Sequence, residues 1–497
     1  MFDFGILPPA MFGSMVIFML YGFPVAFSLA AVGLLFGVIG IFTGHFDPAF
    51  LQALPLRVFG IVSNDLLLAI PFFTLMGAIL ERCGLAEDLL EGTGKLFGAI
   101  PGGLAYAVII VGAILGAITG TVAASVITMG VISLPIMLKY GYNPRLATGV
   151  IAASGTITQV IPPSLVLIVL ADQLGKSVGD MYLGAIGPSI LQVLIFVLFI
   201  FALSIFRPKD IPPLPLEARG ELNRALVFKV LAGMIPSIVL IFLVLGTIFM
   251  GLATPTEAGA LGVVGALALA AMHRRLTWDL VKQGMHSTMH ITAMVTFILV
   301  GATCFSLVFQ GMDGGRWIEH MLSHVPGGAV GFLIFVNAFI FVLAFFLDFF
   351  EIAFIVIPML APVANSLGID LIWFGVLICI NMQTSFMHPP FGFALFYLRS
   401  IAPRSVKTSD IYMGAIPWVF MQLILVAITI FWPESVTYWL DKTPPVDLST
   451  IKIEVPAFGN PGGGNQMPNF GLPPIGGDQP GAPAGAPKPD LSQPPKF

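Results

Sequence analysis

Apolar runs long enough to cross a lipid bilayer account for most of the chain between residues 8 and 432. A spanning helix needs about 20 apolar residues, and proline, glycine or charged residues separate the runs. Hydrophobic residues make up 57% of the chain and charged residues 10%, whereas an ordinary soluble domain has about 25% charged residues. A water-soluble fold is therefore excluded, and the pattern predicts an all-α polytopic membrane protein. The runs fall near 8–22, 24–43, 66–82, 103–138, 146–171, 184–206, 230–250, 254–272, 287–311, 329–362, 371–397 and 412–432.

The charged residues and cysteines indicate neither a nucleic-acid partner nor a metal centre. The formal net charge is −4, with no basic domain and no acidic run. Cys83, Cys304 and Cys379 lie far apart, so neither a disulfide framework nor a metal site is expected from them. The first residues lack the charged n-region and cleavage site of a signal peptide, and we expect the N-terminus to be retained.

Basic loops predict the orientation of the chain in the membrane. By the positive-inside rule, the segments 207–229, 273–282 and 399–407 face the cytoplasm. One span follows the last of these, which places the C-terminal segment outside the cytoplasm. From residue 441 the composition changes to proline, glycine and short polar residues, and we expect a disordered tail over 433–497. Such a tail is typical of a linker or tether, with partner docking as the alternative.

An internal repeat divides the rest of the chain. The stretch from Pro135 to Pro163 has a counterpart from Pro362 to Pro390, with its proline and glycine anchors in the same order. We therefore predict a first transmembrane repeat over 1–206, a cytoplasmic linker over 207–229 and a second repeat over 230–432. If each half has five spans and one hairpin, the odd number of crossings inverts the second half, as in many secondary transporters.

Two proline pairs predict interrupted helices at the centre of the membrane. Pro162-Pro163 and Pro389-Pro390 both follow polar residues inside apolar runs. Each proline removes an N–H and disrupts helical bonding, which leaves carbonyls able to coordinate a small cation such as Na⁺. Interrupted helices are tolerated in hydrocarbon only where they are packed in protein or line a wet cavity.

The long runs 103–138 and 329–362 each have room for a helix followed by a re-entrant hairpin. In the first, Gly116, Thr119, Gly120, Thr121 and Ser125 combine small residues with hydroxyl groups. Such residues line ion sites, although they also let helices approach each other closely.

In the second run, Asp348 and Glu351 lie three residues apart, which would put both on one helical face. A buried carboxylate in a membrane suggests a substrate, cation or proton pathway. The alternatives are a carboxylate that reaches water at the interface and a structural pair with a neighbouring helix. His388, before the second proline pair, is either a titrating group or a hydrogen-bonded packing residue.

Enzymatic motifs are missing from the sequence. It contains no GxxxxGK[ST] phosphate loop, no HExxH and no GxSxG. ATP coupling and hydrolase chemistry on this chain are therefore disfavoured.

Several segments, taken together and in order, resemble the large membrane subunit of tripartite ATP-independent periplasmic (TRAP) transporters. The second half is most similar to the subgroup labelled for mannitol or chloroaromatic compounds and 2-oxo acids. The matching segments are NDLLLAIPFFTLMGAILERCGLAEDL, PGGLAYAVIIVGAILGAITGTVAAS, LPIMLKYGYNPRLATGVIAASGTITQVIPPS, TPTEAGALG and FLDFFEIAFIVIPMLAPVANSLGIDLIWFGVLICINMQTSFMHPPFGFALFYLR.

This resemblance implies an elevator-type transporter of the bacterial inner membrane, with two inverted repeats that carry re-entrant hairpins and interrupted helices. It implies sodium-gradient-driven uptake of an organic acid, with Na⁺ as the coupling ion and no cofactor. The implied partners are a small four-helix membrane subunit and a periplasmic substrate-binding protein. A channel and a membrane-embedded enzyme using Asp348, Glu351 and His388 are the competing interpretations.

The resemblance also places the sites near the hairpin tips and the interrupted helices. For sodium it implies Thr119, Gly120, Thr121, Thr158, Ile161 and Pro163 in the first half, and Thr384, Ser385 and Pro389 in the second. For substrate we expect Ser125, Gln159, Asp348, Glu351 and His388.

The chain departs from the family at three places. Thr119-Gly120-Thr121 replaces the usual Ser-Gly-Ser and keeps both hydroxyls. His388 replaces a threonine, so a hydroxyl contact is lost there, and the long tail is unusual.

Overall fold

The structure is a computed structural model that describes residues 5–440, except Leu216, 219–223, His324, Phe346 and Phe391. The side chains of residues 85–88, 118, 119, 225, 226, 229, 232 and 323 are also outside the description. The tail expected from residue 441 onward therefore lies outside the described residues.

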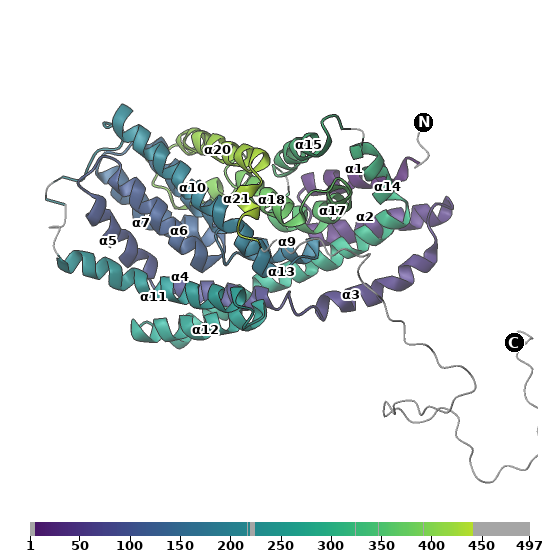
Figure 1. Cartoon of the computed structure of the whole chain (residues 1–497), viewed down its shortest axis with the longest axis horizontal. Coiled ribbons are helices and arrows are strands. Elements are labelled where there is room, and N and C mark those ends of the chain that lie inside the picture. The colour runs from purple at the N-terminus through teal and green to yellow at the C-terminus, as the bar shows by residue number, and fades with distance from the viewer. Residues whose placement is uncertain are drawn as a thin grey trace, which may run out of the picture. The chain divides into compact units, whose positions relative to one another are not determined.

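All regular elements in this part of the chain are helices, so the predicted all-α class is confirmed (Figure 1). The first half contains α1 (Leu7–Leu20), α2 (Val25–Phe42), η1 (Pro48–Ala53), α3 (Leu54–Val62), α4 (Ala69–Arg82), α5 (Leu85–Phe97), α6 (Gly103–Thr119), α7 (Val122–Lys139), α8 (Pro144–Thr156), η2 (Ile157–Gln159), α9 (Leu165–Leu174) and α10 (Val178–Phe206). The second contains α11 (Arg224–Phe249), α12 (Pro255–Met272), α13 (Trp278–Gly311), α14 (Gly314–Ser323), α15 (Gly328–Leu343), α16 (Phe349–Glu351), η3 (Ile352–Val356), α17 (Ile357–Ser366), α18 (Leu371–Ser385), α19 (Phe393–Ile401), α20 (Thr408–Phe431) and α21 (Glu434–Thr437).

Seven helical segments in the described residues are long and apolar enough to cross a membrane. They are α2, α7, α10, α12, α13, the segment from α16 to α17, and α20. The remaining apolar runs form shorter helices because proline and glycine divide them. In particular, the run 103–138 is one hairpin made of α6 and α7, and not a helix followed by a separate hairpin.

The same order of elements occurs twice. A hairpin, a helix broken near its middle and a long apolar helix follow one another as α6 to α10 and again as α15 to α20. Both breaks fall at the proline pairs, Pro162-Pro163 and Pro389-Pro390, as the sequence indicated. The boundaries of the two halves and their opposite orientation in a membrane stay predictions.

Each hairpin packs against both halves of the chain. In the first hairpin, α7 contacts α8 of its own half and α19 of the other. In the second, α17 contacts α18 of its own half and α9 of the other. Because each hairpin contacts the broken helices of both halves, the two breaks lie close together. The Thr156 hydroxyl is 3.7 Å from the Met387 sulfur.

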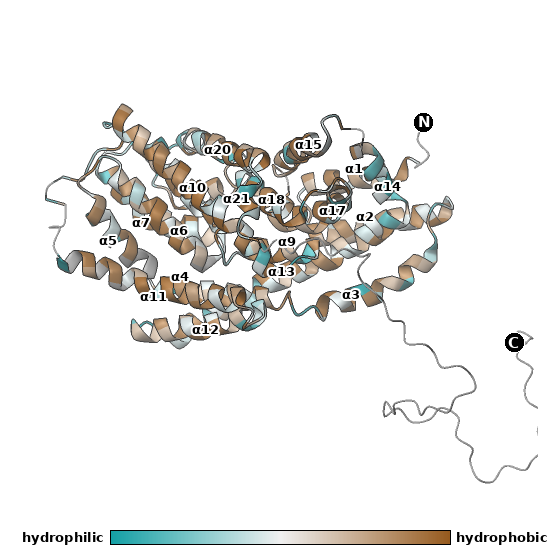
Figure 2. Cartoon of the chain, viewed as in Figure 1, coloured by the Kyte–Doolittle hydropathy of each residue, from teal (hydrophilic) through white to brown (hydrophobic). Residues whose placement is uncertain are grey.

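The outer helices are apolar on the surface that they leave uncovered. Figure 2 shows α10, α11 and α12 as hydrophobic along most of their length. On α10, the large side chains of Ile190, Leu194 and Leu198 are 60%, 49% and 54% exposed. Exposure on this scale would promote aggregation in water, so these faces fit a surface against lipid or another membrane helix.

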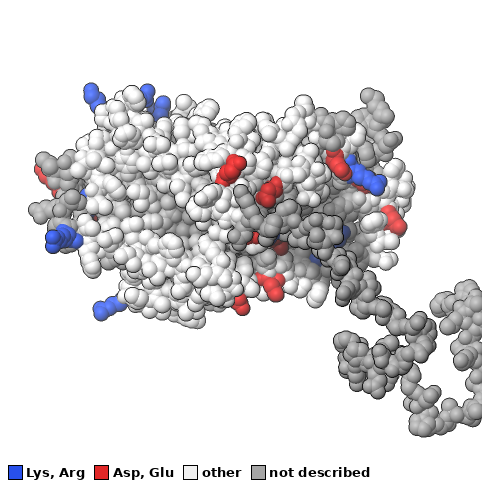
Figure 3. All heavy atoms as spheres, viewed as in Figure 1, with Lys and Arg blue, Asp and Glu red and all other residues white. Residues whose placement is uncertain are grey.

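Charged residues are unevenly distributed over the surface. On the face drawn in Figure 3, most lysines and arginines lie toward the left, whereas most acidic residues lie toward the centre and right. The left end of Figure 1 holds α5 and the ends of α10 and α11 that adjoin the segment 207–224. This distribution agrees with the predicted cytoplasmic side of the linker.

Parts of the predicted linker and of the predicted tail belong to helices or contact them. The first helix of the second half, α11, begins at Arg224. Residues 207–214 form hydrogen bonds to the segments on either side of the first hairpin. Asn143 N donates to Asp210 O (2.8 Å), and Leu214 N donates to Gly98 O (2.8 Å). Residues 434–437, which we assigned to the tail, form α21. They are ordered because Ser435 and Val436 are buried against α10.

A buried amide network joins α10, α18 and α20. The Gln192 Nε2 donates to the side-chain oxygens of Gln383 (2.6 Å) and Gln422 (3.1 Å), and Gln422 donates to the carbonyl of Ile380 (3.1 Å). None of the three glutamines is exposed. Since amides in an apolar interior have no alternative partners, the network fixes the positions of α10 and α20 against α18.

We predict that Gln192→Leu destabilises the protein, because it leaves the amides of Gln383 and Gln422 without their shared partner. Each unsatisfied buried group costs about 1–3 kcal/mol, so the thermal unfolding midpoint of the purified protein in detergent should fall. Gln52→Leu is the control, because Gln52 is exposed. Equal midpoints for the two variants would contradict a structural role for the network.

Candidate functional site

The two hairpin tips and the two broken helices meet at one pocket of about 240 Å³. One wall is α13, which contributes Ile291 and Met294. The lining residues are Gly120, Thr121, Val122, Ala123, Gln159, Leu165, Val166, Ile291, Met294, Asp348, Phe349, Phe350, Phe386, Phe393 and Tyr397. Four predicted site residues, Gly120, Thr121, Gln159 and Asp348, are therefore brought together from positions more than 200 residues apart in the chain.

The first tip is formed by two residues between α6 and α7. Gly120 ends α6 with a φ of +62°, a conformation that favours glycine. Its N–H donates to Gly116 O (3.3 Å). Thr121 is extended and precedes α7, which places it at the pocket. The side chain of Thr119 lies outside the described residues.

The first break brings unpaired oxygens next to this tip. Thr158 is fully buried, and its hydroxyl has no hydrogen-bond partner among the described residues. The side-chain oxygen of Gln159 is likewise buried and unpaired. Gly116 lies directly against Thr158, since a Cβ at that glycine would be 3.0 Å from the Thr158 Cα. The end of α6 and the break in the helix are thus in contact.

Several carbonyls at the first break are already used by side chains. The carbonyl of Gln159 accepts from the Ser164 hydroxyl and from the Cys379 thiol (3.3 Å). The carbonyl of Val160 accepts from the Ser189 hydroxyl (3.1 Å). Ser164 also caps α9, and a serine between a proline pair and an apolar run is a sequence signal for such a cap. Nothing in the sequence pairs Ser189 with this break.

The second tip is a helix cap. Asp348 Oδ1 accepts from Phe349 N (2.7 Å). Asp348 N donates to Glu351 Oε2 (2.9 Å), and the Asp348 side chain accepts from the backbone N–H of Glu351, so these two residues form a capping box at α16. The prediction that both carboxylates share one helical face is wrong, because Asp348 precedes the helix. Asp348 lines the pocket, whereas Glu351 is buried and is not among the lining residues.

The second break differs from the first in how its polar groups are used. The hydroxyls of Thr384 and Ser385 donate to carbonyls of their own helix, Asn381 O (2.7 Å) and Met382 O (2.5 Å). His388 does not line the pocket. Its ring is buried between Phe341 and Phe345, with both centroid separations 4.2 Å, and neither ring nitrogen has a partner among the described residues.

The other predicted site residues are not among those that line the pocket. Ser125 and Pro163 are buried. Pro389 is half-buried at the second break. Ile161 lines a separate apolar groove between α10 and α11. Sequence reasoning missed Ile291, Met294 and Tyr397, because an isolated residue in an apolar helix gives no sign of the pocket it faces.

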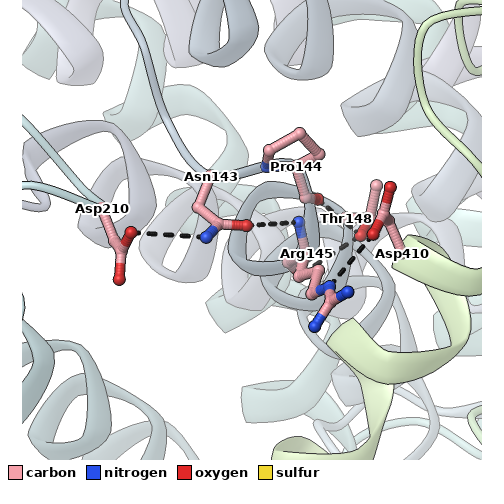
Figure 4. Close-up of polar contacts among 6 residues, drawn as sticks. All are labelled: Asn143, Pro144, Arg145, Thr148, Asp210 and Asp410. Atoms are coloured by element: carbon pink, nitrogen blue, oxygen red, sulfur yellow. Dashed lines mark hydrogen bonds and ion pairs between the residues drawn. The ribbon is translucent and has the colours of Figure 1, made fainter.

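The N-terminus of α8 fixes the broken helix at its other end (Figure 4). Asn143 caps α8 by accepting from Arg145 N (3.0 Å) and donates to Asp210 Oδ1 (3.3 Å). Arg145 Nε pairs with Asp410 Oδ1 on α20 at 3.0 Å. Because Arg145 is about half exposed, the ion pair contributes little energy and serves mainly to align α8 with α20.

Comparison with known proteins identifies the architecture. Residues 12–435 match the family described as "Tripartite ATP-independent periplasmic transporter, DctM component". The chain belongs to this family of transporter permease subunits. Its members are named as transport proteins and not as enzymes.

Relatives cover nearly the whole DctM region. The chain is 30% identical to the uncharacterized protein YgiK of Salmonella typhimurium over 87% of this chain and 97% of that one. It is 28% identical to the C4-dicarboxylate TRAP transporter large permease protein DctM of Pseudomonas aeruginosa, over 78% and 89%. It is 26% identical to the sialic acid TRAP transporter large permease protein SiaM of Vibrio cholerae, over 83% and 93%.

A solved structure shows a related fold. The YdaH transporter of Alcanivorax borkumensis, described as having an unusual topology, matches with a TM-score of 0.58 at 14% identity, over 84% of this chain and 98% of that one. At this identity the likeness concerns the fold alone.

We predict that Glu351 supports the second tip without acting on substrate. Glu351→Gln keeps an oxygen that accepts from Asp348 N, so uptake should stay within about twofold of the wild-type rate. Glu351→Ala removes the acceptor and should lower stability by about 1 kcal/mol. Uptake assays and thermal unfolding measure the two effects. Loss of uptake in a stable Glu351→Gln variant would instead show that the charge of Glu351 is needed.

Proposed function

We propose that this DctM-family chain couples a sodium gradient to the uptake of an organic acid delivered by a periplasmic binding protein. The observation that carries the proposal is the single pocket formed by both hairpin tips and both broken helices. Secondary transporters bind substrate and coupling ions at interrupted helices near the membrane centre. The pocket in this chain also lies at interrupted helices, and it is lined by helix ends, hydroxyl groups, an amide and one carboxylate.

The first half of the site fits sodium better than a transition metal. Na⁺ takes oxygen ligands, and Thr121, Thr158 and Gln159 supply neutral oxygens close to the end of α6. The unpaired Thr158 hydroxyl and Gln159 carbonyl oxygen would otherwise cost free energy in the interior, and a cation would satisfy both. Asp348, which also lines the pocket, adds a negative charge that favours a cation there. Neutral ligands also allow the ion to leave during each transport cycle.

The second half offers fewer ion ligands. Thr384 and Ser385 direct their hydroxyls to their own helix, and His388 presents a ring instead of the family's hydroxyl. We therefore place the principal sodium site in the first half, at Thr119, Gly120, Thr121 and Thr158. The carbonyls of Ile161 and Pro163 in the first half, and Thr384, Ser385 and Pro389 in the second, remain weaker candidates.

The names of relatives and the size of the pocket support an organic acid as the substrate. The relatives are named for C4-dicarboxylates, sialic acid and isethionate, all of which are organic acids. A pocket of about 240 Å³ suits a small molecule of this kind. Gln159, Thr121 and Tyr397 offer neutral hydrogen-bond donors to a carboxylate, and bound Na⁺ would offset the charge of Asp348.

Sodium dependence gives the direct test. Replacing both Thr119 and Thr121 by valine, or Thr158 alone, keeps approximate shape and removes hydroxyl ligands. An ion ligand worth roughly 1–2 kcal/mol raises the sodium concentration for half-maximal uptake about five- to thirtyfold. Uptake by proteoliposomes, with the binding protein present, measures this shift.

Thr429→Val is the matched control, because the buried Thr429 hydroxyl bonds only to its own helix at Leu425 O (2.9 Å). Unchanged sodium dependence in the site variants would assign their hydroxyls to helix packing. Flux in the wild type that neither saturates nor depends on Na⁺ would favour a channel.

We also predict a stable complex with a small helical subunit in the bacterial inner membrane. The exposed apolar faces of α10 and α11 give such a subunit room to bind. Co-purification of this chain from the native membrane, followed by mass spectrometry, should recover one additional small membrane protein. Full uptake by this chain and the binding protein alone would contradict the prediction.

A further inference from the structure

A second pocket, of about 430 Å³, lies along the same helix as the first. It differs in being polar, with one arginine, one aspartate, amides and hydroxyls on its walls. Its lining residues are Arg57, Gly60, Ile61, Asn64, Leu67, Asp172, Gln173, Leu299, Ala302, Thr303, Ser306, Gln310, Phe354 and Pro358.

The two pockets share three walls. On α13, Ile291 and Met294 line the first pocket, and Thr303, Ser306 and Gln310, which are spaced three and four residues apart, line the second. The other shared walls are α9 and the second arm of the second hairpin, from α16 to α17. With a rise of 1.5 Å per residue, the pockets are separated by about 18 Å along α13.

The region between them on α13 is apolar and closed. Val295 and Ile298 are 2% and 7% exposed, and they pack in the same core as Ile352 and Ile355 of η3. The pockets therefore lie at the two ends of one seam between α13 and the hairpin.

Arg57 and Asp172 are the two charged residues that line the second pocket, and they differ in their hydrogen bonding. Asp172 Oδ1 accepts from Asn64 Nδ2 (2.8 Å), and Asp172 Oδ2 accepts from Gln173 Nε2 (2.9 Å). Arg57, by contrast, forms no ion pair or hydrogen bond with any described residue. On the other face of α3, Leu56, Phe59 and Val62 are 74%, 66% and 66% exposed, so this face is the one suited to lipid.

The second pocket lies on the side away from the basic loops. The α9 end with Asp172 and the α13 end with Gln310 are opposite to the N-termini of α8 and α13, next to which Lys139, Arg274 and Arg275 lie. By the positive-inside rule the second pocket faces the outside.

We propose that this pocket is the outer reception site for the transported organic anion, with Arg57 as the residue that attracts the carboxylate and Thr303, Ser306 and Gln310 as neutral hydrogen-bonding partners. The inference rests on the proposed function for the class of its ligand. The geometry of the second pocket is independent of that function. The anion would pass from this pocket to the hairpin tips along α13 when the hairpin moves relative to that helix.

The local charge can be measured without transport. A variant in which Cys83, Cys304 and Cys379 are replaced by alanine carries one new cysteine, Ser306→Cys, and is labelled in spheroplasts with impermeant methanethiosulfonates. We expect the new cysteine of Ser306→Cys to react from outside. Because of the positive charge of Arg57, the anionic ethylsulfonate reagent should label it faster, relative to the cationic trimethylammonium reagent, than it would without that charge. Adding Arg57→Gln should lower the anion-to-cation rate ratio roughly three- to tenfold, and Arg57→Lys should largely retain it.

Two controls make the measurement specific. Leu252→Cys lies on an exposed loop and is not among the residues that line this pocket, and its rate ratio should not change with Arg57→Gln. Arg316→Gln removes an exposed arginine of α14 that pairs with Asp313 (3.5 Å), and it should not change the ratio at Ser306→Cys. No labelling of Ser306→Cys from outside, or a ratio unaffected by Arg57→Gln, would overturn the proposal.

Uptake then separates this inference from the proposed function. In the chain with its native cysteines, Arg57→Gln should raise the substrate concentration for half-maximal uptake several-fold and leave the sodium dependence unchanged. Arg316→Gln should change neither the substrate concentration for half-maximal uptake nor the sodium dependence. If the wild type takes up no organic acid, the proposed function fails while the labelling result still stands. If uptake is normal and Arg57→Gln alters neither labelling nor uptake, the reception site alone is wrong.

Discussion

The structure depends on one constraint: in hydrocarbon, every backbone N–H and C=O needs a partner. Two helices are broken at proline pairs, and both breaks are buried at the centre of the described part of the chain. At the first break, side chains from α9, α10 and α18 take up the carbonyls, through Ser164, Ser189 and Cys379. At the second, the chain closes its own turn, with Gly392 N donating to His388 O (2.7 Å) and Ala394 N to Phe386 O (3.0 Å).

This difference makes the two halves chemically unequal although their elements follow the same order. At the first break, a threonine hydroxyl and an amide oxygen beside the hairpin tip have no hydrogen-bond partner among the described residues. The second uses both hydroxyls internally and inserts the ring of His388 between two phenylalanines. Among the described residues, the duplicated architecture therefore leaves unpaired side-chain oxygens in one half, while the other half contributes apolar walls and the carboxylate of Asp348 to the pocket.

The arrangement also suggests how movement and specificity are divided. The hairpins and broken helices form one packed unit around the pocket, and α13 supplies a long wall that passes both pockets. The buried glutamines and the contact between Arg145 and Asp410 tie α8, α10, α18 and α20 together. These internal polar contacts hold the unit together as one body, because they have no substitute in lipid.

The sequence by itself determined the local features: the apolar runs, the helix breaks at Pro162-Pro163 and Pro389-Pro390, the tip at Gly120 and the basic loops. These follow from residue type and spacing, since hydrophobic length and proline act within a few residues. Only the tertiary structure decided which oxygens are available, because hydrogen-bond partners come from distant segments. In the tertiary structure, the Thr158 hydroxyl has no partner among the described residues, whereas the Thr384 hydroxyl bonds to its own helix. Asp348 and Glu351 form a helix cap and not a pair on one helical face. Residues of α13 form one wall of the pocket. Those outcomes depend on long-range packing, which no local pattern specifies.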